Sequence, residues 1–590
     1  MEKRISKKLS ALLLGAGLVL AACQGDTESA GEAAATYEGV GQGRNGDIVT
    51  EVTVENGQIT NVEVIESSET ENLAEPVYTN LGDEIVASNS TEVDAVTGST
   101  KTSVGYLEAI NDALESNNVI LEDGTSEGAA QNEMDEEYEY DVVVIGAGGA
   151  GYSTAIEAAN QGYSVTILEK LPVTGGNTLI SGGEMNAPGN WVQENLGIEG
   201  DSPEVFYEDT IVGGDHLGDP DMVRIMADQA LESAEWLRDE IEVEFIEDQL
   251  FQFGGHTYPR ALIPIGHSGQ EVINKLDAEA EELGIDIYTE TPAVELITDD
   301  NNSVIGVMAT NEDKEITFNA NEGVIITTGG FGANIEMRME ANEEFDERYV
   351  TTNSPGAEGQ GITMAQELGA ATENMESIQT YPVSNPETGE ISLLADTRFD
   401  GAALINQEGN RFVEELERRD VISTGILEQP GGYTFQIWDQ KLAEDTGTLE
   451  AHQGELQRLL DSDLIYVADT LEEGAEYWDI PVDQFMETVD YINEAAASGE
   501  DPEYDHRSGL APLEVGPFYF QKATPSVHHT MGGLVINENT EVLDEEGNPI
   551  ENLYAAGEVT GVIQGSNRLG GNAIIDIITF GRIAGQKIGN

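Results

Sequence analysis

Cysteine is almost absent from this sequence, since Cys23 is the single one among 590 residues. One cysteine cannot form a disulfide within the chain or supply the four thiolates that hold an iron–sulfur cluster. It also cannot make the C-x-x-C-H attachment of a c-type haem. We therefore expect no disulfide, no cysteine-ligated metal and no such haem, and we predict no metal site elsewhere.

Basic residues are also scarce: 25 Lys and Arg stand against 113 Asp and Glu, for a net charge of −88. Nucleic-acid binding requires cations for the phosphates, so this balance excludes a nucleic-acid partner. The acidity indicates a solvated surface suited to salty or alkaline surroundings, because net charge bears on solubility rather than fold. The length predicts several domains, and the 66 glycines with 39% apolar residues suit α/β folding.

A long membrane-spanning run is lacking near the N-terminus. Four of the first eight residues are Lys or Arg, and a short apolar stretch follows up to residue 22. This pattern is typical of a signal peptide, which we assign to residues 1–22. The run LAAC at 20–23 resembles the bacterial lipobox, which implies that Cys23 is lipidated and anchors the protein outside the cytoplasmic membrane. Residues 23–35 then form a flexible spacer.

The first folded unit is expected over residues 36–121. Two alternating runs flank Glu55-Asn56-Gly57 and predict a hairpin, and a glycine turn later leads into an amphipathic helix. The run DAVTGST at 94–100 resembles the motif of small α+β domains that carry FMN covalently. The resemblance implies that FMN is esterified to Thr100 by a flavin transferase, although Ser99 stands where the family usually has Ala. The acidic residues 122–138 form a linker.

A second unit opens at residue 139 with a strand, a glycine turn, a helix and a second strand. Gly146, Gly148 and Gly151 form G-x-G-x-x-G, which permits a tight turn and a close approach of the backbone to a pyrophosphate. Glu169 follows eighteen residues after Gly151, where an acidic side chain takes the ribose hydroxyls. The pattern predicts dinucleotide binding, and the single cation Lys170 does not make a pocket for NADP.

Three further glycine-rich segments indicate that the dinucleotide is FAD. They are LPVTGGNTLISGGEMNAP at 171–188, EGVIITTGGFG at 322–332 and IENLYAAGEVTG at 550–561. They resemble the FAD-dependent fumarate reductase and succinate dehydrogenase flavoprotein superfamily, nearest to its extracytoplasmic branch that includes urocanate reductase. The resemblance implies non-covalent FAD lined by Ala150, Glu169, Asn177, Thr178, Gly182, Gly183, Gly330, Glu558, Ala573 and Ile574, besides the three glycines.

Two adjacent histidines, His528 and His529, lie between a predicted turn at Pro525 and the pair Gly532–Gly533. With the segment around Arg568 they resemble the active-site segments of the same superfamily. Reduction of an activated C=C bond requires a group that binds the substrate carboxylate and a hydrogen-bond donor that stabilises the negative charge developing in the transition state. The resemblance gives these two tasks to His529, with His528 alongside, and a bidentate carboxylate clamp to Arg568, for which an arginine fork is well shaped.

The proton source is expected in the run RFVEELERRD, where the resemblance selects Arg419, with its neighbour Arg418 as the alternative. Free arginine rarely gives up its proton, so a relay must restore it. Arg398 matches the relay arginine of the family. The relay glutamate falls on Ala395, and Asp396, one residue later, is the candidate substitute.

The same region bears on the substrate. Fumarate reductases have a histidine in a Q-A-H-P run and a Thr-Glu pair in the later segment, whereas this chain has Tyr381 and Leu394 at the positions of the histidine and threonine. Asp396 adds a carboxylate, which disfavours a second substrate carboxylate and suits a ring N–H. Tyr381 with Asp396 resembles the urocanate reductase pattern, and Glu184 is a further acceptor. Packing by Tyr381 and solvation of Asp396 are the alternative, with fumarate or another enoate as substrate.

The expected architecture is α/β. A Rossmann-like FAD-binding domain is formed by residues 139–375 and 530–590, an α+β clamp domain over 376–529 closes on the substrate, and the α+β FMN-binding domain precedes both. Electrons would pass from a quinol- or flavin-linked membrane donor to FMN, then FAD, then substrate. A dehydrogenase running in reverse and an electron-transfer lipoprotein with an inactive FAD domain are the alternatives.

The Thr100 assignment predicts the behaviour of the denatured protein. When the chain is produced with a flavin transferase, a fluorescent flavin should remain on a peptide that contains Thr100, whereas FAD should be released. Thr100→Ala should remove the retained flavin, as measured by fluorescence of the denatured protein. Retention of that flavin by the variant would show that Thr100 is not the attachment residue.

Overall fold

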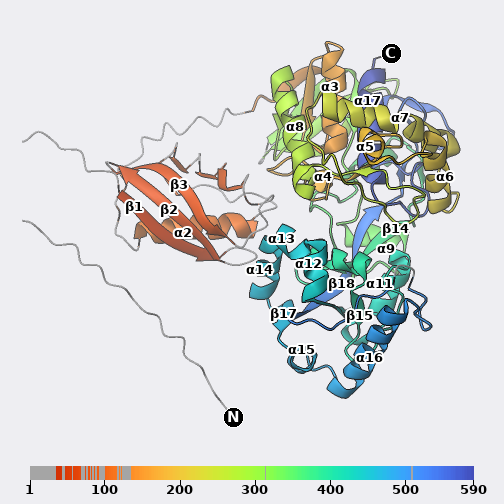
Figure 1. Cartoon of the computed structure of the whole chain (residues 1–590). Coiled ribbons are helices and arrows are strands. Elements are labelled where there is room, and N and C mark those ends of the chain that lie inside the picture. The colour runs from red at the N-terminus through yellow and green to blue at the C-terminus, as the bar shows by residue number, and fades with distance from the viewer. Residues whose placement is uncertain are drawn as a thin grey trace, which may run out of the picture.

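The computed structural model describes residues 35–42, 47–55, 57–67, 100–115, 134–311, 314–506 and 509–589, with isolated positions between 74 and 121. Figure 1 shows three units in chain order: a small sheet with one helix, a larger α/β unit, and a second α/β unit inserted into it. The apolar residues of the three units form separate clusters. Within the described part of the chain, no helix has both the length and the apolarity to cross a membrane. Cys23 and the predicted signal peptide and spacer up to residue 34 lie outside the described residues.

The small unit is an antiparallel sheet covered by one helix. The strands β1 (Ala35–Gln42), β2 (Asp47–Glu55) and β3 (Gln58–Ser67) lie in that order, so the predicted hairpin is confirmed. The helix α2 (Thr100–Glu115) buries Tyr106 and Ile110 against the sheet. It lies directly on β1, because a Cβ at Gly39 would be 2.1 Å from the Ala109 carbonyl oxygen. Thr100 begins α2, but its side chain and residues 92–99 are outside the described residues.

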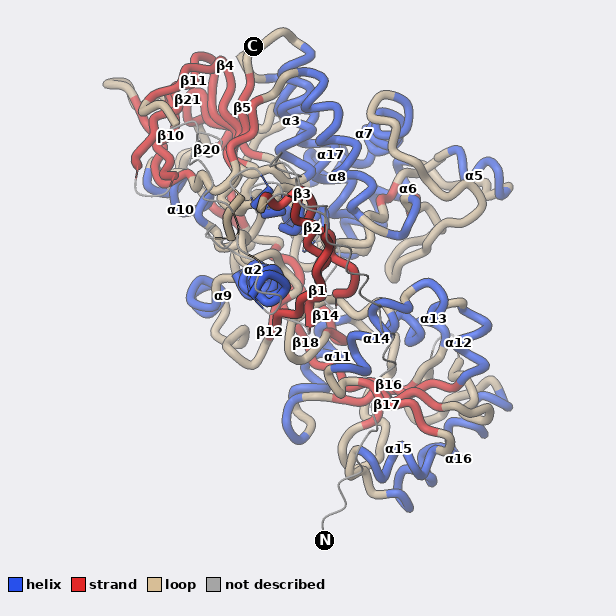
Figure 2. The backbone as a smooth tube through the Cα atoms, turned by 90° about the vertical axis from the view of Figure 1, so that its left-hand side faces the viewer, coloured by secondary structure: helices blue, strands red, loops and turns tan. Residues whose placement is uncertain are grey.

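The larger unit contains an eight-stranded sheet in the order β20-β21-β11-β4-β5-β8, with β10 and β9 continuing beside β11. Strands β21, β11, β4, β5 and β8 run parallel, and the helices α3, α8 and α17 cover one face (Figure 2). The predicted strand–turn–helix–strand is confirmed as β4, α3 and β5. The bounds are β4 (Glu137–Ile145), α3 (Gly149–Asn160), β5 (Val165–Leu168), α8 (Gly269–Leu283), β8 (Asp286–Tyr288), β9 (Ala293–Thr298), β10 (Val304–Asn311), β11 (Lys314–Ile326), β20 (Glu541–Leu543), β21 (Pro549–Ala555) and α17 (Asn572–Lys587).

Shorter elements lie between the strands of this sheet in the sequence. They connect the parallel strands and position the loops described below. Their bounds are α4 (Gly176–Leu179), β6 (Met185–Asn186), α5 (Trp191–Leu196), α6 (Pro203–Gly213), α7 (Pro220–Asp239), β7 (Ala261–Leu262), η1 (Ile265–His267), α9 (Ile335–Ala341), β12 (Val350–Thr351), α10 (Gln360–Glu367), β13 (Thr372–Glu373) and β19 (Gly533–Leu534).

The inserted unit is built on the long strand β18 (Phe518–Thr530). Strand β14 (Ile378–Ser384) leads the chain into the unit, β18 leads it out, and the two pair antiparallel. Strands β16 and β17 also pair with β18, and helices pack around them. The other bounds are η2 (Leu394–Asp400), β15 (Ala403–Ile405), α11 (Arg419–Leu427), η3 (Pro430–Gly432), β16 (Thr434–Asp439), α12 (Gln440–Thr446), α13 (Thr448–Ala451), α14 (Gln453–Asp461), β17 (Ile465–Ala468), α15 (Leu471–Tyr477) and α16 (Val482–Ser498).

The predicted turn at Pro525 is wrong, because Pro525 lies inside β18. The ladder between β14 and β18 has a register shift there, between the pairs Tyr381↔Ser526 and Ser384↔Thr524. A proline has no N–H to donate, and it is accepted in a strand where the ladder is interrupted. His528 and His529 therefore stand near the end of a continuous strand rather than at a bend.

The glycines of the β4–α3 turn fix how closely α3 packs on the sheet. Gly146 has φ +106°, in the left-handed region that favours glycine. A Cβ at Gly151 would lie 1.9 Å from the Gly146 carbonyl oxygen. The turn therefore admits no side chain at Gly151 without movement of α3.

Gly151→Ala should consequently destabilise this unit and weaken FAD retention, since overpacking of this kind costs about 1–3 kcal/mol. Thermal unfolding and the flavin content of the purified protein measure both effects. The control is Gly254→Ala, because a Cβ at Gly254 meets no atom within 4 Å. Equal melting temperatures and flavin contents for the two variants would contradict the packing argument.

Candidate active site

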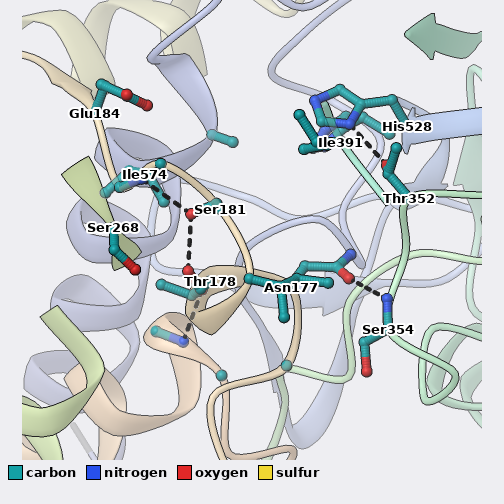
Figure 3. A pocket seen from close by; sticks show the side chains of 18 of the residues that line it. Asn177, Thr178, Ser181, Glu184, Ser268, Thr352, Ser354, Ile391, His528 and Ile574 are labelled. Atoms are coloured by element: carbon teal, nitrogen blue, oxygen red, sulfur yellow. Dashed lines mark hydrogen bonds between the residues drawn. The ribbon is translucent and has the colours of Figure 1, made fainter. Parts of the chain in front are cut away.

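A cavity of about 1250 Å³ lies where the larger unit meets the inserted one. The parallel strands of the sheet end at one side of it, with the β4–α3 turn and the loop after β11. The inserted unit supplies the opposite side, through β14, β18, the start of α11 and the segment α12–α14. Figure 3 shows this arrangement, with Asn177 and Thr178 on one side and His528 with Ile391 on the other.

The β4–α3 turn has the features of a pyrophosphate cradle. Gly148 is the N-cap of α3 and has no side chain, so the first N–H groups of the helix meet the cavity. The Gly149 N–H donates to Thr178 Oγ1 at 3.2 Å. Gly146, Gly148, Ala150 and Thr178, which the sequence predicts to contact FAD, all line the cavity.

Glu169 follows β5 at the position expected for a ribose ligand. Its two carboxylate oxygens accept the N–H groups of Ala147, at 2.9 Å, and Leu171, at 2.8 Å. Burial raises the pKa of Glu169, while these two hydrogen bonds favour the ionised form. A carboxylate offers about four acceptor positions, so Glu169 can also accept a hydrogen bond from a ribose hydroxyl.

Asn177 and Glu558 meet across the cavity wall. Asn177 Nδ2 donates to Glu558 Oε2 at 3.3 Å, and its carbonyl oxygen accepts the Ser354 N–H at 2.7 Å (Figure 3). Glu558 Oε1 also accepts the Thr530 N–H, at 3.0 Å, directly after the histidine pair. Hydrogen bonds therefore connect the glycine-rich segments 171–188 and 550–561 to each other and to the end of β18.

The other residues predicted to line FAD divide into two groups. Gly182, Gly183, Ala573 and Ile574 line the cavity. Gly151 and Gly330 are not among the cavity-lining residues; instead they allow close packing behind it, since a Cβ at Gly330 would lie 1.9 Å from Thr530 Oγ1. The long cavity, the helix N-terminus and the glutamate after β5 together fit a dinucleotide.

No group of three or more His, Cys, Asp or Glu among the described residues is arranged to hold a metal ion.

Both histidines face the cavity in the neutral state. Burial, followed by the charges of Arg419 and Arg568, lowers the pKa of His528 and His529 well below its usual value. His528 Nδ1 lies 2.8 Å from Thr352 Oγ1, and His529 Nδ1 lies 3.6 Å from Glu558 Oε1. A neutral imidazole can present one N–H to a substrate oxygen without adding charge.

Two guanidinium groups converge on one side chain that the sequence reasoning missed. Gln379 Oε1 accepts Arg568 Nη2 at 2.9 Å and Arg419 Nη1 at 3.4 Å. Gln379 Nε2 donates to the Arg568 carbonyl oxygen at 2.6 Å. Strand alternation could have revealed it, because Gln379 and Tyr381 are two residues apart on β14 and share one face.

Arg568 is buried and is held near another cation. Burial and the charge of Arg419 lower its pKa to about 9. Its Nε has no hydrogen-bond partner among the residues that the structure describes. The arrangement favours binding of an anion beside Arg568, because a carboxylate would supply an acceptor and offset the repulsion between the two cations.

The structure distinguishes the two neighbouring arginines. Arg419 is the first residue of α11, lines the cavity and has its guanidinium carbon 5.2 Å from the centre of the Tyr381 ring. Arg418 has 53% of its side chain exposed and pairs with Asp420 at 3.1 Å. Only Arg419 of the two lines the cavity.

The predicted substrate-selecting residues are partly brought together. Tyr381 and Glu184 line the cavity, from β14 and from the loop after α4 respectively. Arg398 is buried beneath the wall and does not line it; its Nη1 donates to the Glu415 carbonyl oxygen at 2.5 Å. Ala395 is fully buried. Asp396 lies in η2, but its side chain is outside the described residues.

Sequence reasoning also missed the rim of the cavity. The rim consists of residues 249, 251–253 and 265–268 of the larger unit and of cavity-lining residues of the α13–α14 segment of the inserted one, among them His452, Glu455 and Arg458. These residues carry no motif, and only the folded chain brings them together.

Comparisons with known proteins agree with this geometry. A profile of the FAD binding domain matches residues 141–574, and a profile of the FMN-binding domain matches residues 43–115. A urocanate reductase of Eggerthella lenta is 40% identical over 97% of this chain and 96% of its own length. An NADH:fumarate oxidoreductase of Klebsiella pneumoniae is 34% identical over 92% of this chain, which spans 57% of that relative.

Among solved structures, the open conformation of a flavocytochrome c3 fumarate reductase aligns with a TM-score of 0.68 and 35% identity. The alignment covers 76% of this chain and 78% of that one. With the two domain matches, the relatives show that this chain belongs to the fumarate and urocanate reductase family of flavoproteins, and that it combines an FAD-binding domain with an FMN-binding domain.

Proposed function

We propose that the chain reduces urocanate to dihydrourocanate (imidazolepropanoate). Its family membership makes it an oxidoreductase that acts on the C=C bond of an unsaturated carboxylate. The observation that carries the finer proposal is Tyr381 in the cavity wall beside Arg419, at the position where fumarate reductases have a histidine. The urocanate reductase relative supports the same substrate.

Arg568 and His529 hold the substrate carboxylate in this mechanism. The guanidinium of Arg568 is oriented by Gln379 and makes a charge-assisted contact with the carboxylate. His529 donates its N–H to the same carboxylate, on which negative charge grows as the β-carbon is reduced, with His528 alongside. Preorganised donors of this kind usually give the largest single contribution to catalysis.

FAD, held by the β4–α3 turn and Glu169, would supply the hydride when bound. Arg419 supplies the proton to the other carbon, from the wall formed by β14 and α11. Arg419 lies close to Arg568, because both guanidinium groups donate to Gln379 Oε1. Asp396 and Arg398 are the proposed route by which the proton is replaced.

Tyr381, Asp396 and Glu184 are proposed to surround the imidazole of urocanate. A ring N–H gains a hydrogen bond to a charged group worth roughly 1.5–3 kcal/mol. A second substrate carboxylate would instead meet like charge, at a cost of roughly 4 kcal/mol at contact with an effective dielectric of about 20. Fumarate is the second candidate substrate, because the fumarate-reducing relative is 34% identical over most of this chain.

The N-terminal part of the chain is proposed to deliver electrons. FMN esterified to Thr100 by a flavin transferase would take electrons from a quinol- or flavin-linked membrane donor and pass them to FAD. Lipidation of Cys23 would hold the protein at the outer face of the cytoplasmic membrane, near that donor. The reaction would then serve as the last step of anaerobic respiration.

Arg419→Ala should lower turnover of the enoate by at least about 100-fold, the usual scale for general acid–base catalysis. FAD content should stay unchanged, because Arg419 lies on the inserted unit. The matched control is Arg418→Ala, since the exposed Arg418 pairs with Asp420. Steady-state oxidation of a reduced viologen measures both variants, and near-normal turnover in Arg419→Ala would remove Arg419 from the mechanism.

Urocanate should exceed fumarate in kcat/KM by at least about 100-fold, because roughly 1.4 kcal/mol corresponds to a factor of ten. Asp396→Ala should narrow that gap by removing the carboxylate that disfavours fumarate. A panel of enoates with a low-potential donor provides the measurement. Comparable turnover of the two acids by the wild-type protein would favour fumarate reductase.

A further inference from the structure

Residues 392–394, at the start of η2, are hydrogen-bonded to a side chain of the distant helix α14. Helix N-termini leave backbone N–H groups without partners inside the helix. Leu393 N and Leu394 N both donate to Glu455 Oε2, each at 3.1 Å. Ser392 Oγ donates to Glu455 Oε1 at 2.5 Å. One carboxylate of α14, about sixty residues further along the chain, therefore acts as the N-terminal cap of η2.

Ser392 extends this contact to the strand that carries the histidines. Gln521 Nε2 donates to Ser392 Oγ at 2.5 Å, and both side chains are buried. A hydroxyl can accept one hydrogen bond and donate another, so Ser392 serves both partners at once. Gln521 belongs to β18, on which His528 and His529 follow. Glu455 thus joins α14, η2 and β18.

Glu455 also lies at the cavity between the larger and the inserted unit. Glu455 lines the cavity, as do Ile391, Leu393 and the rim residues His452 and Arg458. Figures 1 and 2 place α13 and α14 at the edge of the inserted unit that faces the larger unit. A movement of that edge would therefore be transmitted to η2 through hydrogen bonds to a charged group, which are stronger than neutral ones.

We propose that Glu455 is a positioning residue. It fixes the start of η2, and with it the cavity wall that selects the substrate, relative to α14 at the rim of the cavity. The inference rests on the proposed enoate reduction and deepens it. Ser392, Leu393 and Leu394 closely precede Asp396, so the carboxylate holds the backbone at the start of the segment in which this chain departs from fumarate reductases. Glu455 makes no proton or hydride transfer; it acts through η2.

The test is Glu455→Ala in the full-length, FAD-loaded protein, assayed with urocanate and with fumarate. We expect KM for the preferred enoate to rise by at least about tenfold, as for the loss of a hydrogen bond to a charged group. We expect kcat to change by less than about threefold, because the groups that act in the transition state are untouched. The ratio of kcat/KM between the two acids should fall by at least about fivefold, since selectivity is a difference between two binding energies.

Two further variants test whether the effect comes from the hydrogen bonds of Glu455, from its charge, or from a general loss of stability of α14. Glu455→Gln should keep KM within about threefold, because an amide oxygen still accepts the two backbone N–H groups. The control Asp461→Ala removes another acid of α14, whose exposed carboxylate accepts a hydrogen bond from Gln457 on the same helix, and it should leave all constants unchanged. A Gln variant as impaired as the Ala variant would overturn the positioning role.

Ser392→Ala provides an independent test should Glu455→Ala fail to retain FAD, because it removes one of the three hydrogen bonds to Glu455 and the link from Glu455 to Gln521 of β18. It should raise KM and lower the selectivity ratio in the same direction. Unchanged KM and selectivity in a folded, FAD-loaded Ser392→Ala or Glu455→Ala variant would overturn the inference. Absence of enoate turnover by the wild-type protein would instead refute the proposed function, so the two failures are distinct.

Discussion

Two guanidinium groups brought close together on one amide oxygen are the constraint on which the rest of this site depends. Gln379 Oε1 accepts hydrogen bonds from both Arg568 and Arg419, although like charges repel. Burial adds to that repulsion and lowers the pKa of Arg568. The arrangement is unfavourable in isolation and becomes favourable when an anion lies between the cations and accepts hydrogen bonds from both.

The fold holds these groups in place through elements that are far apart in the sequence. Arg568 lies just before α17 of the larger unit, whereas Arg419 begins α11 of the inserted one, and β14 carries Gln379 between them. The ladder between β14 and β18 brings the histidines beside the same cavity. Burial, together with the charges of the two arginines, lowers the pKa of both histidines and keeps the imidazoles neutral. The site therefore offers hydrogen-bond donors without adding the charges of two imidazolium groups to those of the arginines.

The two arginines of the cavity contrast with the strongly acidic charge of the whole chain. A net charge of −88 repels anionic substrates at long range, while salt screens exposed charges beyond about 10 Å. Inside the cavity the screening is weaker, so Arg568 and Arg419 act strongly on a carboxylate that has entered. In the proposed function, selection among enoates depends on Tyr381, which lies beside Arg419 in the cavity wall, and on the segment held by Glu455.

The sequence alone predicted the order of the units and the β4–α3 turn, because a local motif such as G-x-G-x-x-G has a fixed backbone requirement. Resemblance to a family also placed Arg568 and the histidine pair in one cavity. Only the tertiary structure decided that Arg419 rather than Arg418 lines it, since the two differ only in the direction of their side chains at the start of α11. It also revealed Gln379 and Glu455, and it replaced the turn at Pro525 by a strand, because contacts between distant segments leave no local pattern in the chain.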